Sequence, residues 1–234
     1  MLNFFDILYP QKPYCISCNK RLKPNEYILC NECNGKIDVI KPPVCLKCGR
    51  ELGFSYQRQT TCSECSKSHL HFVEARAYGH YNGVLKKLIY EFKYKRRREV
   101  SKVLSEKMVK TINRLDWPKF DWLVPTPLHV KRQRERGFNQ SELLAREMSK
   151  VLETSLFNGL VRVKYTEHQT LLDKSSREKN LEGAFDVIKK QDINGKRLLL
   201  VDDVYTTGAT AEQCAKSLIK AGCRDVFVIT CARG

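Results

Sequence analysis

The segment 198–210, LLLVDDVYTTGAT, carries the side chains best suited to bind a small polar ligand. A run of apolar residues leads directly into two carboxylates, Asp202 and Asp203, and hydroxyl groups and a glycine follow at once. Backbone N–H groups beside the start of a helix bind phosphate, whereas carboxylates repel phosphate and accept hydrogen bonds from hydroxyl groups. The segment therefore predicts a ligand with a phosphate at one end and a diol beside it, such as a ribose 5-phosphate. It is not a P-loop, because the Gly-Lys-Ser/Thr ending is missing.

A second set of chemically competent residues lies in four Cys-x-x-Cys pairs near the amino terminus. The pairs are Cys15 and Cys18, Cys30 and Cys33, Cys45 and Cys48, and Cys62 and Cys65. Two such pairs supply the four thiolates of a closed tetrahedral zinc site. We therefore expect two structural Zn²⁺ ions, one on the first four cysteines and one on the last four, with interleaved pairing as the alternative. Disulfides are the competing interpretation, but no export signal is visible at the start of the chain, and cytosolic thiols stay reduced.

The composition is that of an ordinary domain with a smaller module attached. The chain has 234 residues, of which 42% are hydrophobic, and the crowding of cysteines at one end divides it into a module over 1–70 and a domain over 71–234. No apolar run approaches the roughly 18 residues of a membrane span, so we expect a cytoplasmic protein without a membrane segment. The formal net charge of +16 indicates either a basic soluble surface or affinity for polyanions such as nucleic acid.

The elements that must position the two carboxylates are read from the hydrophobic pattern. Residues 197–201 predict a buried parallel strand, 209–222 a helix that ends at Gly222, and 225–231 the closing strand. Open parallel sheets bind ligands beyond the carboxyl ends of their strands. Adjacent residues of a strand point to opposite faces, so we expect the chain to be leaving the strand at Asp202 and Asp203.

A strand over 122–125 precedes a basic loop, HVKRQRERG, and then a helix that begins near Asn139 or Ser141. A strand, a basic loop containing glycine and a helix start together predict an anion site, because arginine forks match phosphate oxygens. An exposed basic loop without a ligand is the alternative. The basic residues of this loop are Lys131, Arg132, Arg134 and Arg136.

Helical stripes over 84–92 and 100–112 flank a second basic stretch, KYKRRRE. Its neighbours Tyr90, Phe92 and Tyr94 could stack on single-stranded nucleic acid. The favoured interpretation is a solvated helix junction whose aromatic rings point to the core, because Phe92 fits the apolar stripe. The polar stretch 166–196 is long enough to be a functional loop that closes over a ligand.

The segment LLLVDDVYTTGAT resembles the phosphoribosyl diphosphate (PRPP) motif of type I phosphoribosyltransferases. With the cysteine-rich start, VPTPLHVKRQRERGFNQ and NLEGAF, the chain is similar over nearly its whole length to the ComF family, especially its ComFC-type competence proteins. The resemblance implies an α/β fold, with a Rossmann-like parallel sheet of the type I phosphoribosyltransferase kind preceded by a small cysteine-rich double zinc ribbon. It also implies a role in DNA uptake during natural transformation.

The resemblance assigns a role to each matching residue. Asp202 and Asp203 would be the catalytic pair that holds the ribose 2′- and 3′-hydroxyls, and Mg²⁺ would bridge ribose and pyrophosphate oxygens. The residues around the 5′-phosphate would be Thr206, Thr207, Gly208, Ala209 and Thr210, with Val204 and Tyr205 beside them. Those on the pyrophosphate side would be Arg132, Arg134, Arg136 and Gly137. The hood over the ligand would be 166–185, with Lys174, Arg177 and Lys179.

The implied reaction is displacement of pyrophosphate from the anomeric carbon through an oxocarbenium-like state, with an unidentified acceptor. Purine-salvage relatives often carry an aspartate where this chain has Thr206, so the resemblance does not support a purine acceptor. A second interpretation is a non-catalytic module, regulated by PRPP, that handles single-stranded DNA or proteins of the competence machinery such as a helicase. The complete motif favours PRPP binding, and it leaves turnover open.

Overall fold

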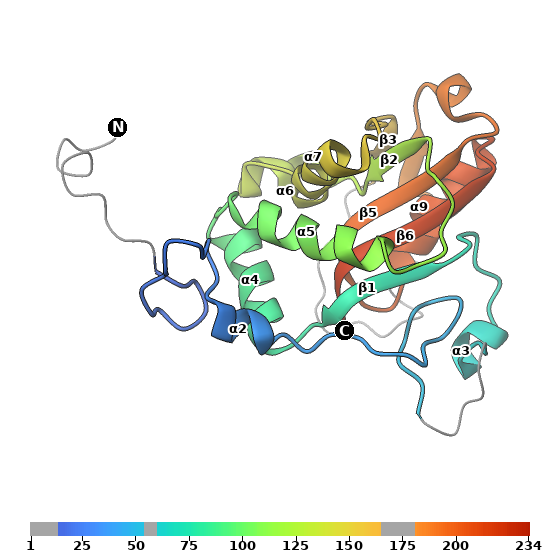
Figure 1. Ribbon diagram of the computed structural model, residues 1–234. Coiled ribbons are helices and arrows are strands. Elements are labelled where there is room, and N and C mark those ends of the chain that lie inside the picture. Colours follow the sequence, from blue (N-terminus) through green and yellow to red (C-terminus); the bar gives the residue numbers. More distant parts are fainter. Residues whose placement is uncertain (1–13, 54–59, 165–180) are drawn as a thin grey trace.

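The computed structural model describes residues 14–53, 60–164 and 181–234, and its centre is a four-stranded parallel sheet in the order β1-β6-β5-β2 (Figure 1). The pattern of apolar residues predicts three of these strands within a few residues. The strands are β1 (Ala75–His80), β2 (Trp122–Pro125), β5 (Arg197–Tyr205) and β6 (Asp225–Arg233).

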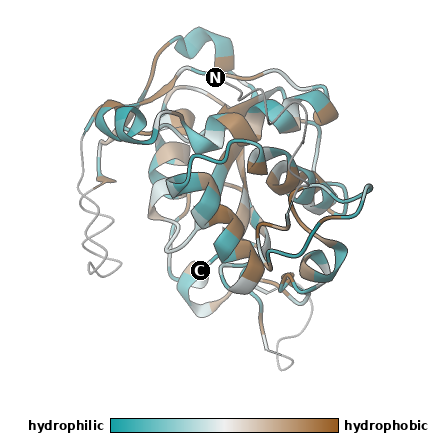
Figure 2. Cartoon of the chain, turned by 90° about the vertical axis from the view of Figure 1, so that its left-hand side faces the viewer, coloured by the Kyte–Doolittle hydropathy of each residue, from teal (hydrophilic) through white to brown (hydrophobic). Residues whose placement is uncertain are grey.

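Helices cover both faces of this sheet, and most of them carry both hydrophilic and hydrophobic residues (Figure 2). Those between the strands are α4 (Gly83–Tyr94), α5 (Val100–Ile112), α6 (Val130–Arg136), α7 (Gln140–Leu152) and α9 (Ala209–Lys220). A short hairpin of β3 (Leu160–Arg162) and β4 (Phe185–Val187) and a 3₁₀ turn (Lys190–Ile193) complete the domain.

Two apolar clusters fill the two sides of the sheet. Leu199 and Val201 of β5 pack with α4, α5 and α7 on one side, whereas Leu198 and Leu200 pack with α9 and the β3–β4 hairpin on the other. Strand β5 is buried on both faces, which is why its sequence is a continuous apolar run rather than an alternating one. Cys214, Cys223 and Cys231 are buried in these clusters, as expected for unpaired small apolar residues.

The predicted loop over the basic residues 131–136 is wrong, because these residues form the helix α6. The helix has no buried residues, so hydrophobic periodicity could not reveal it. Its Lys, Arg, Gln and Glu side chains are nonetheless good helix formers, and the His129 side chain accepts a hydrogen bond from the Lys131 N–H at its start. Gly137 ends the helix at φ +78°, a left-handed conformation that glycine adopts without strain.

The expectation that the chain leaves the sheet at Asp202 and Asp203 is also wrong. Strand β5 continues to Tyr205, and the strand that ends is its neighbour β2, whose last residue, Pro125, pairs with Val201. The carboxylates therefore lie where one side of β5 has lost its partner strand. Of the two, Asp202 keeps partial exposure and Asp203 is buried.

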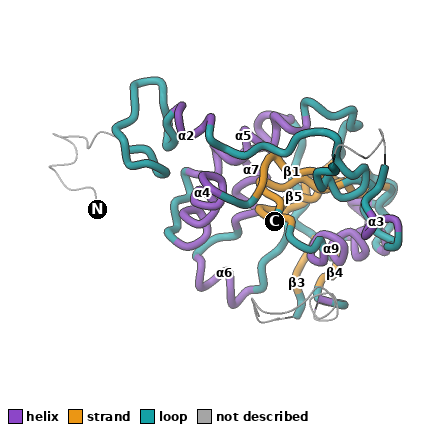
Figure 3. Tube along the Cα trace, turned by 90° about the horizontal axis from the view of Figure 1, so that it is seen from below, coloured by secondary structure: helices purple, strands orange, loops and turns teal. Residues whose placement is uncertain are grey.

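The cysteine-rich module carries two short helices, α2 (Asn31–Gly35) and α3 (Ser63–Ser66), which lie on opposite sides of strand β1 (Figures 1 and 3). The segment 38–40 between them runs antiparallel along the outer edge of β1, where the Ile40 N–H donates to the Tyr78 carbonyl and the His80 N–H to the Asp38 carbonyl. Gly79 allows this approach, because a Cβ atom there would lie 2.6 Å from the Asp38 oxygen. The module is thus hydrogen-bonded to the sheet.

Within the described residues, every helix falls short of the length and apolarity that crossing a bilayer requires.

Candidate functional site

The eight cysteines of the amino-terminal module form two separate clusters. One contains Cys15, Cys18, Cys30 and Cys33, and the other contains Cys45, Cys48, Cys62 and Cys65; within each, the sulfur atoms all lie within 4.8 Å of one another. The Sγ atoms of Cys18 and Cys30 are 3.7 Å apart and those of Cys48 and Cys62 are 3.8 Å apart. Four sulfurs around one Zn²⁺ at about 2.3 Å lie roughly 3.8 Å apart, so both clusters have the dimensions of Cys₄ zinc sites.

The pairing is sequential, as predicted, and the cysteines are free thiols rather than disulfides. The two sites are built alike. In both, the third cysteine is the N-cap of a short helix and its N–H points at the first sulfur, at 3.4 Å for Cys30 on Cys15 and 3.2 Å for Cys62 on Cys45. His69 and His71 belong to neither cluster, and His71 instead pairs with Glu212 of α9.

The two carboxylates of β5 have different surroundings. Asp203 is buried and its Oδ1 atom lies 2.7 Å from Nζ of Lys93, at the end of α4, with side-chain exposures of 10% and 15%. Burial opposes the charge on Lys93, but the Asp203 carboxylate outweighs this effect and raises the Lys93 pKa. A buried charge pair of this kind fixes the position of both side chains. Asp203 is therefore anchored to the α4 side of the sheet.

Asp202 is half-buried and faces the start of α7. Its Oδ1 atom accepts hydrogen bonds from the Ser141 hydroxyl at 2.9 Å and from the Asp203 N–H at 2.8 Å. Burial and the nearby charge of Asp203 raise the pKa of Asp202 to about 7. Two adjacent carboxylates thus divide into one that is paired with a cation and one that is held by neutral donors and gains protons easily.

The start of α7 brings unpaired hydrogen-bonding groups to the same place. Asn139 caps the helix through a bond from the Ser141 N–H, and its own amide donates to the carbonyl of Thr126, directly after β2. Gln140 and Thr126 are 1% and 5% exposed, yet the Gln140 Nε2 and Thr126 Oγ1 atoms have no hydrogen-bond partner among the described residues. Buried polar atoms without partners are costly, so these two groups are available to a polar ligand.

The hydroxyl-rich loop 206–210 follows Asp203 and leads into α9. Gly208 has a φ of +86° and is the N-cap of the helix, so the loop turns in a left-handed conformation directly before the first N–H groups of α9. The Thr207 hydroxyl accepts a weak bond from the Ala209 N–H, while Thr206 is exposed. A glycine-containing turn that leads into a helix start is the geometry for which the sequence predicts a phosphate, and that role stays a prediction.

The two basic segments that the sequence separates lie together in the structure. Arg96 donates to the carbonyl of Glu135 and Arg98 to that of Gly137, so the stretch after α4 wraps the carboxyl end of α6. Arg136 donates to Oε1 of Gln140. Arg132 is partly buried and Arg134 is exposed. The structure therefore brings Arg136 to the unpaired groups at α7 and leaves Arg134 outside them.

The expectation that the aromatic rings near the end of α4 point to the core is right for Phe92 and wrong for two tyrosines. Phe92 is fully buried, whereas Tyr90 and Tyr94 are 47% and 55% exposed. Their rings lie 5.1 Å apart, and the Arg136 guanidinium lies over Tyr94 at 5.5 Å. Positions 90 and 94 are one turn apart on the helix, on the face opposite the apolar stripe. An exposed aromatic surface bordered by basic residues results.

Sequence reasoning missed four residues of this site: Lys93, Thr126, Gln140 and Ser141. Lys93 stood within a run of similar basic residues, and only the fold shows that it turns inward to Asp203. Thr126 and Gln140 lie within the motif that carries the family resemblance and Ser141 follows it directly, but the residue types gave no signal that the first two are buried without partners or that Ser141 binds Asp202. The predicted hood residues Lys174, Arg177 and Lys179 lie outside the described part of the chain.

Comparison with known proteins decides the family. Residues 4–66 match the model of the double zinc ribbon domain. Competence protein F of Haemophilus influenzae is 32% identical over 241 residues, which cover all of both chains, and competence protein ComFC of Bacillus subtilis is 30% identical over 86% of this chain and 81% of its own. The chain belongs to the ComF family. The family predicted from the sequence is thereby confirmed, together with its cysteine-rich zinc module and parallel α/β sheet.

Two further proteins, one found by sequence and one by structure, are similar to this chain. The DNA utilization protein YhgH of Escherichia coli is 28% identical over 92% of this chain and 94% of its own. Among solved structures, a purine phosphoribosyltransferase from Pyrococcus horikoshii matches 57% of this chain and 80% of its own, with 17% identity and a TM-score of 0.33.

Proposed function

We propose that this ComF-family protein binds PRPP with Mg²⁺, transfers its phosphoribosyl group to an acceptor that remains to be identified, and acts in the uptake or use of DNA. The observation that carries the proposal is the grouping around Asp202. A half-buried carboxylate, two buried donors without partners at Thr126 and Gln140, and a phosphate-type loop at the start of α9 all meet where β2 ends.

Each part of PRPP has a chemical counterpart in this grouping. The loop 206–210 suits the 5′-phosphate, because a helix start offers N–H groups and a positive dipole end. Asp202 suits the ribose hydroxyls, which donate hydrogen bonds to a carboxylate. Gln140, Thr126 and Arg136 suit the pyrophosphate, because Gln140 and Thr126 offer unpaired donors and Arg136 donates to Gln140, next to the Ser141 that binds Asp202. Mg²⁺ prefers oxygen ligands and would be held between the pyrophosphate and the carboxylate side of the site.

The chemistry that follows is substitution at the anomeric carbon. The bond from this carbon to the pyrophosphate oxygen breaks, the acceptor's nucleophilic atom bonds to the carbon, and pyrophosphate leaves with the electron pair. The residues at the start of α7 would stabilise the growing charge on pyrophosphate, and the two fixed ends of the ligand would hold the carbon between them. Thr206 offers no acid or base to an acceptor, so the acceptor must carry its own nucleophile or be activated by another residue.

The test is calorimetric titration of the full chain with PRPP in the presence and absence of Mg²⁺. We expect magnesium-dependent binding by the wild type and a loss of at least roughly 100-fold in affinity for Asp202→Asn, because the diol loses a charged acceptor. Glu147→Gln, a partly exposed acid on α7 paired with Lys150, is the matched control and should bind normally. Equal binding by Asp202→Asn and the wild type would refute the site. Release of pyrophosphate during a screen of nucleobases and cell extract then tests turnover.

A second candidate function is a binding module for single-stranded DNA, cytoplasmic and regulated by PRPP, as part of a competence machinery that includes other proteins. The exposed pair Tyr90 and Tyr94, with Arg136 over one ring, favours it, because base–aromatic stacking together with basic residues binds single strands. Relatives named for competence and DNA utilization also support a role in binding DNA.

For this candidate, affinity for a single-stranded oligonucleotide should fall with rising salt. Tyr94→Ala should weaken it by about 1–3 kcal/mol, the value of one stacked base. Tyr27→Ala is the matched control, because Tyr27 is also exposed and lies under a lysine, Lys102, but on the first zinc cluster. Equal losses in the two variants, or an affinity independent of salt, would exclude the tyrosine pair as the DNA surface.

A further inference from the structure

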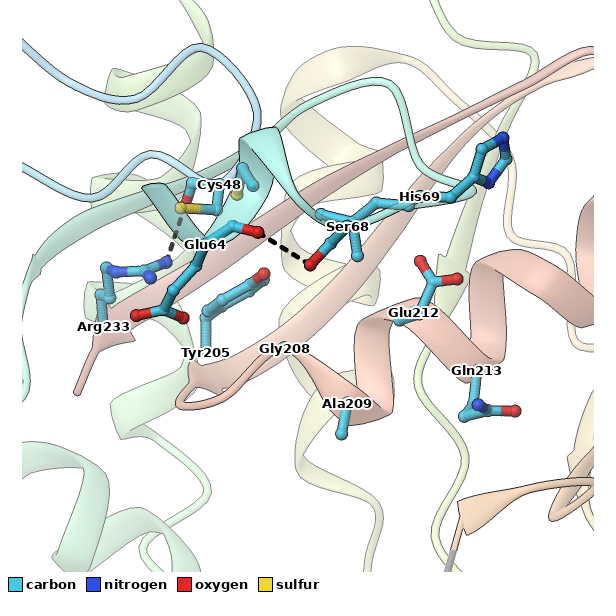
Figure 4. A pocket seen from close by; sticks show the side chains of 12 residues that line it. Cys48, Glu64, Ser68, His69, Tyr205, Gly208, Ala209, Glu212, Gln213 and Arg233 are labelled. Atoms are coloured by element: carbon cyan, nitrogen blue, oxygen red, sulfur yellow. Dashed lines mark hydrogen bonds between the residues drawn. The ribbon is translucent and has the colours of Figure 1, made fainter. Parts of the chain in front are cut away.

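A chain of buried contacts connects the second Cys₄ cluster to the loop 206–210. The Arg233 guanidinium donates to the carbonyl oxygen of Cys48 at 2.7 Å and lies 4.6 Å from the centre of the Tyr205 ring (Figure 4). Arg233 and Tyr205 are neighbours on β6 and β5 and are 7% and 6% exposed. A buried arginine is normally paired with a negative group. Here that group is the second zinc site, because four thiolates on one Zn²⁺ keep a net charge of about −2.

The Tyr205 ring in turn supports the turn of the phosphate-type loop. A Cβ atom at Gly208 would lie 2.2 Å from the Tyr205 hydroxyl and 2.6 Å from Cζ, so the ring is packed directly behind this residue. Gly208 holds the left-handed conformation with which the loop turns into α9. The position of the Tyr205 ring therefore determines where the first N–H groups of α9 point.

Beside this chain of contacts the boundary between the module and the domain is hollow. A pocket of about 190 Å³ separates α3 from the start of α9, and it is lined by Cys48, Tyr205, Gly208 and Arg233 as well as by polar residues of both sides (Figure 4). The second cluster also packs against the domain, because Cys45, Cys48 and Cys62 share a buried apolar cluster with Phe72 and Tyr205. His71 contacts Glu212 in the first turn of α9. Within this boundary, Arg233 and Tyr205 are the side chains that connect Cys48 to Gly208 of the loop.

We infer that the second zinc site positions the phosphate-binding loop through Arg233 and Tyr205, so that these two residues are positioning residues for the ligand while the first zinc site has no such role. The inference rests on the proposed function for its ligand, PRPP. The two zinc sites, which are alike in sequence and in local geometry, would therefore have different roles.

The first cluster makes contacts of the same strength to a different part of the domain. Lys107 of α5 is buried and donates to Oδ1 of Asn34 at 2.5 Å, and its ammonium lies 5.1 Å from the Tyr78 ring. Lys87 of α4 donates to the carbonyl of Ser17. These contacts anchor the first cluster to α4 and α5, and none of these residues belongs to the loop 206–210. Lys107 therefore matches Arg233 in burial, charge and ring contact. It differs in that the ring it contacts belongs to Tyr78 of β1 and not to Tyr205, which packs against the loop 206–210.

The experiment compares Arg233→Met with Lys107→Met in the full, zinc-loaded chain, with Arg233→Lys as the conservative variant. Zinc content is measured first, then PRPP affinity with Mg²⁺ by calorimetry, and then hydrogen exchange of the backbone amides of 206–210. We expect Arg233→Met to keep both zinc ions, to bind PRPP roughly tenfold more weakly and to exchange faster in the loop. Arg233→Lys should recover part of both effects, and Lys107→Met should change neither.

The outcomes separate this inference from the function on which it rests. Unchanged affinity and unchanged exchange in Arg233→Met would overturn it, and so would equal changes in Lys107→Met. If the wild type itself fails to bind PRPP, the proposed function is wrong, and loop exchange alone decides whether Arg233 positions the loop. If Arg233→Met does not fold, Arg233→Lys against Lys107→Arg makes the same comparison, with faster loop exchange expected only in the first.

Discussion

The two neighbouring carboxylates should respond oppositely to the same substitution. Asp203→Asn should destabilise the protein strongly, whereas Asp202→Asn should leave it as stable or more stable at pH 8 while weakening the binding of PRPP by at least roughly 100-fold. The sequence gives no reason for this difference, since the residues are adjacent and chemically identical. The reason lies in their partners, which are Lys93 for Asp203 and the Ser141 hydroxyl for Asp202.

The expected loss of stability in Asp203→Asn follows from the burial of the Asp203–Lys93 ion pair. Lys93 and Asp203 are in contact at 2.7 Å with little solvent around them. Removing one charge of such a pair leaves the other buried without compensation, which costs about 3–5 kcal/mol. The small remaining exposure of both side chains places Asp203→Asn near the lower end, at about 3 kcal/mol of the free energy of unfolding. The double variant Asp203→Asn/Lys93→Met should regain part of this loss, because no unpaired charge remains.

The expected change of stability in Asp202→Asn follows from the raised pKa of the Asp202 carboxyl group. A carboxyl group whose pKa is higher in the folded than in the unfolded protein stabilises the fold below the unfolded value, about 3.9, and this contribution is lost as the pH rises through the folded value, about 7. At pH 8 the buried charge therefore opposes folding. Asparagine keeps the acceptor for Ser141 without the charge, so Asp202→Asn should gain roughly 1–2 kcal/mol at pH 8 and less at pH 5.

Urea unfolding of the wild type, both single variants and the double variant at pH 5 and pH 8 measures these differences. The reasoning is refuted if Asp203→Asn is as stable as the wild type, or if Asp202→Asn loses more than about 1 kcal/mol at pH 8, which would mean that its charge stabilises the fold. The assignment of the raised pKa to Asp202 would be refuted if the stability gained by Asp202→Asn were no larger at pH 8 than at pH 5.

Two further predictions concern the metals and the ligand. The purified protein should contain two zinc ions per chain by elemental analysis, and Cys30→Ser and Cys62→Ser should each halve this content; full content in either variant would show that its cluster is not a zinc site. PRPP affinity should rise between pH 6 and pH 8, because Asp202 must lose its proton to accept hydrogen bonds from the diol. Since the protonation of PRPP itself is common to both proteins, the residual binding of Asp202→Asn should rise less over the same range, and parallel profiles would contradict this role.

The sequence predicts the fold well because its signals are local. The apolar runs of β5 and β6, the stripes of α4 and α5 and the spacing of the cysteine pairs each depend on a few neighbouring residues. Helix α6 could not be predicted in this way, because it buries none of its side chains. Its helical state depends on polar residues of good propensity and on the turn at Gly137, which are weak signals in sequence.

The candidate site is predicted only in its outline, because its details depend on contacts between distant segments. That Asp202 and Asp203 matter is readable from their place after a buried strand, but that one is neutralised by Lys93 is not. The exposure of Tyr90 and Tyr94 likewise depends on how α4 packs against the sheet. The apolar stripe of the helix predicts only that Phe92 is buried. Burial without partners at Gln140 is a property of the folded state that no pattern of residue types expresses.

The segment 38–40, which runs along the outer edge of β1, gives the zinc sites a consequence for the behaviour of the protein in solution. An uncovered edge strand offers its N–H and C=O groups to any other chain, and this is a common route to aggregation. The segment is held between the two Cys₄ clusters, so loss of zinc would release it at both ends and uncover β1. Metal-depleted protein should therefore be removed from solution by strand-to-strand association before its sheet unfolds.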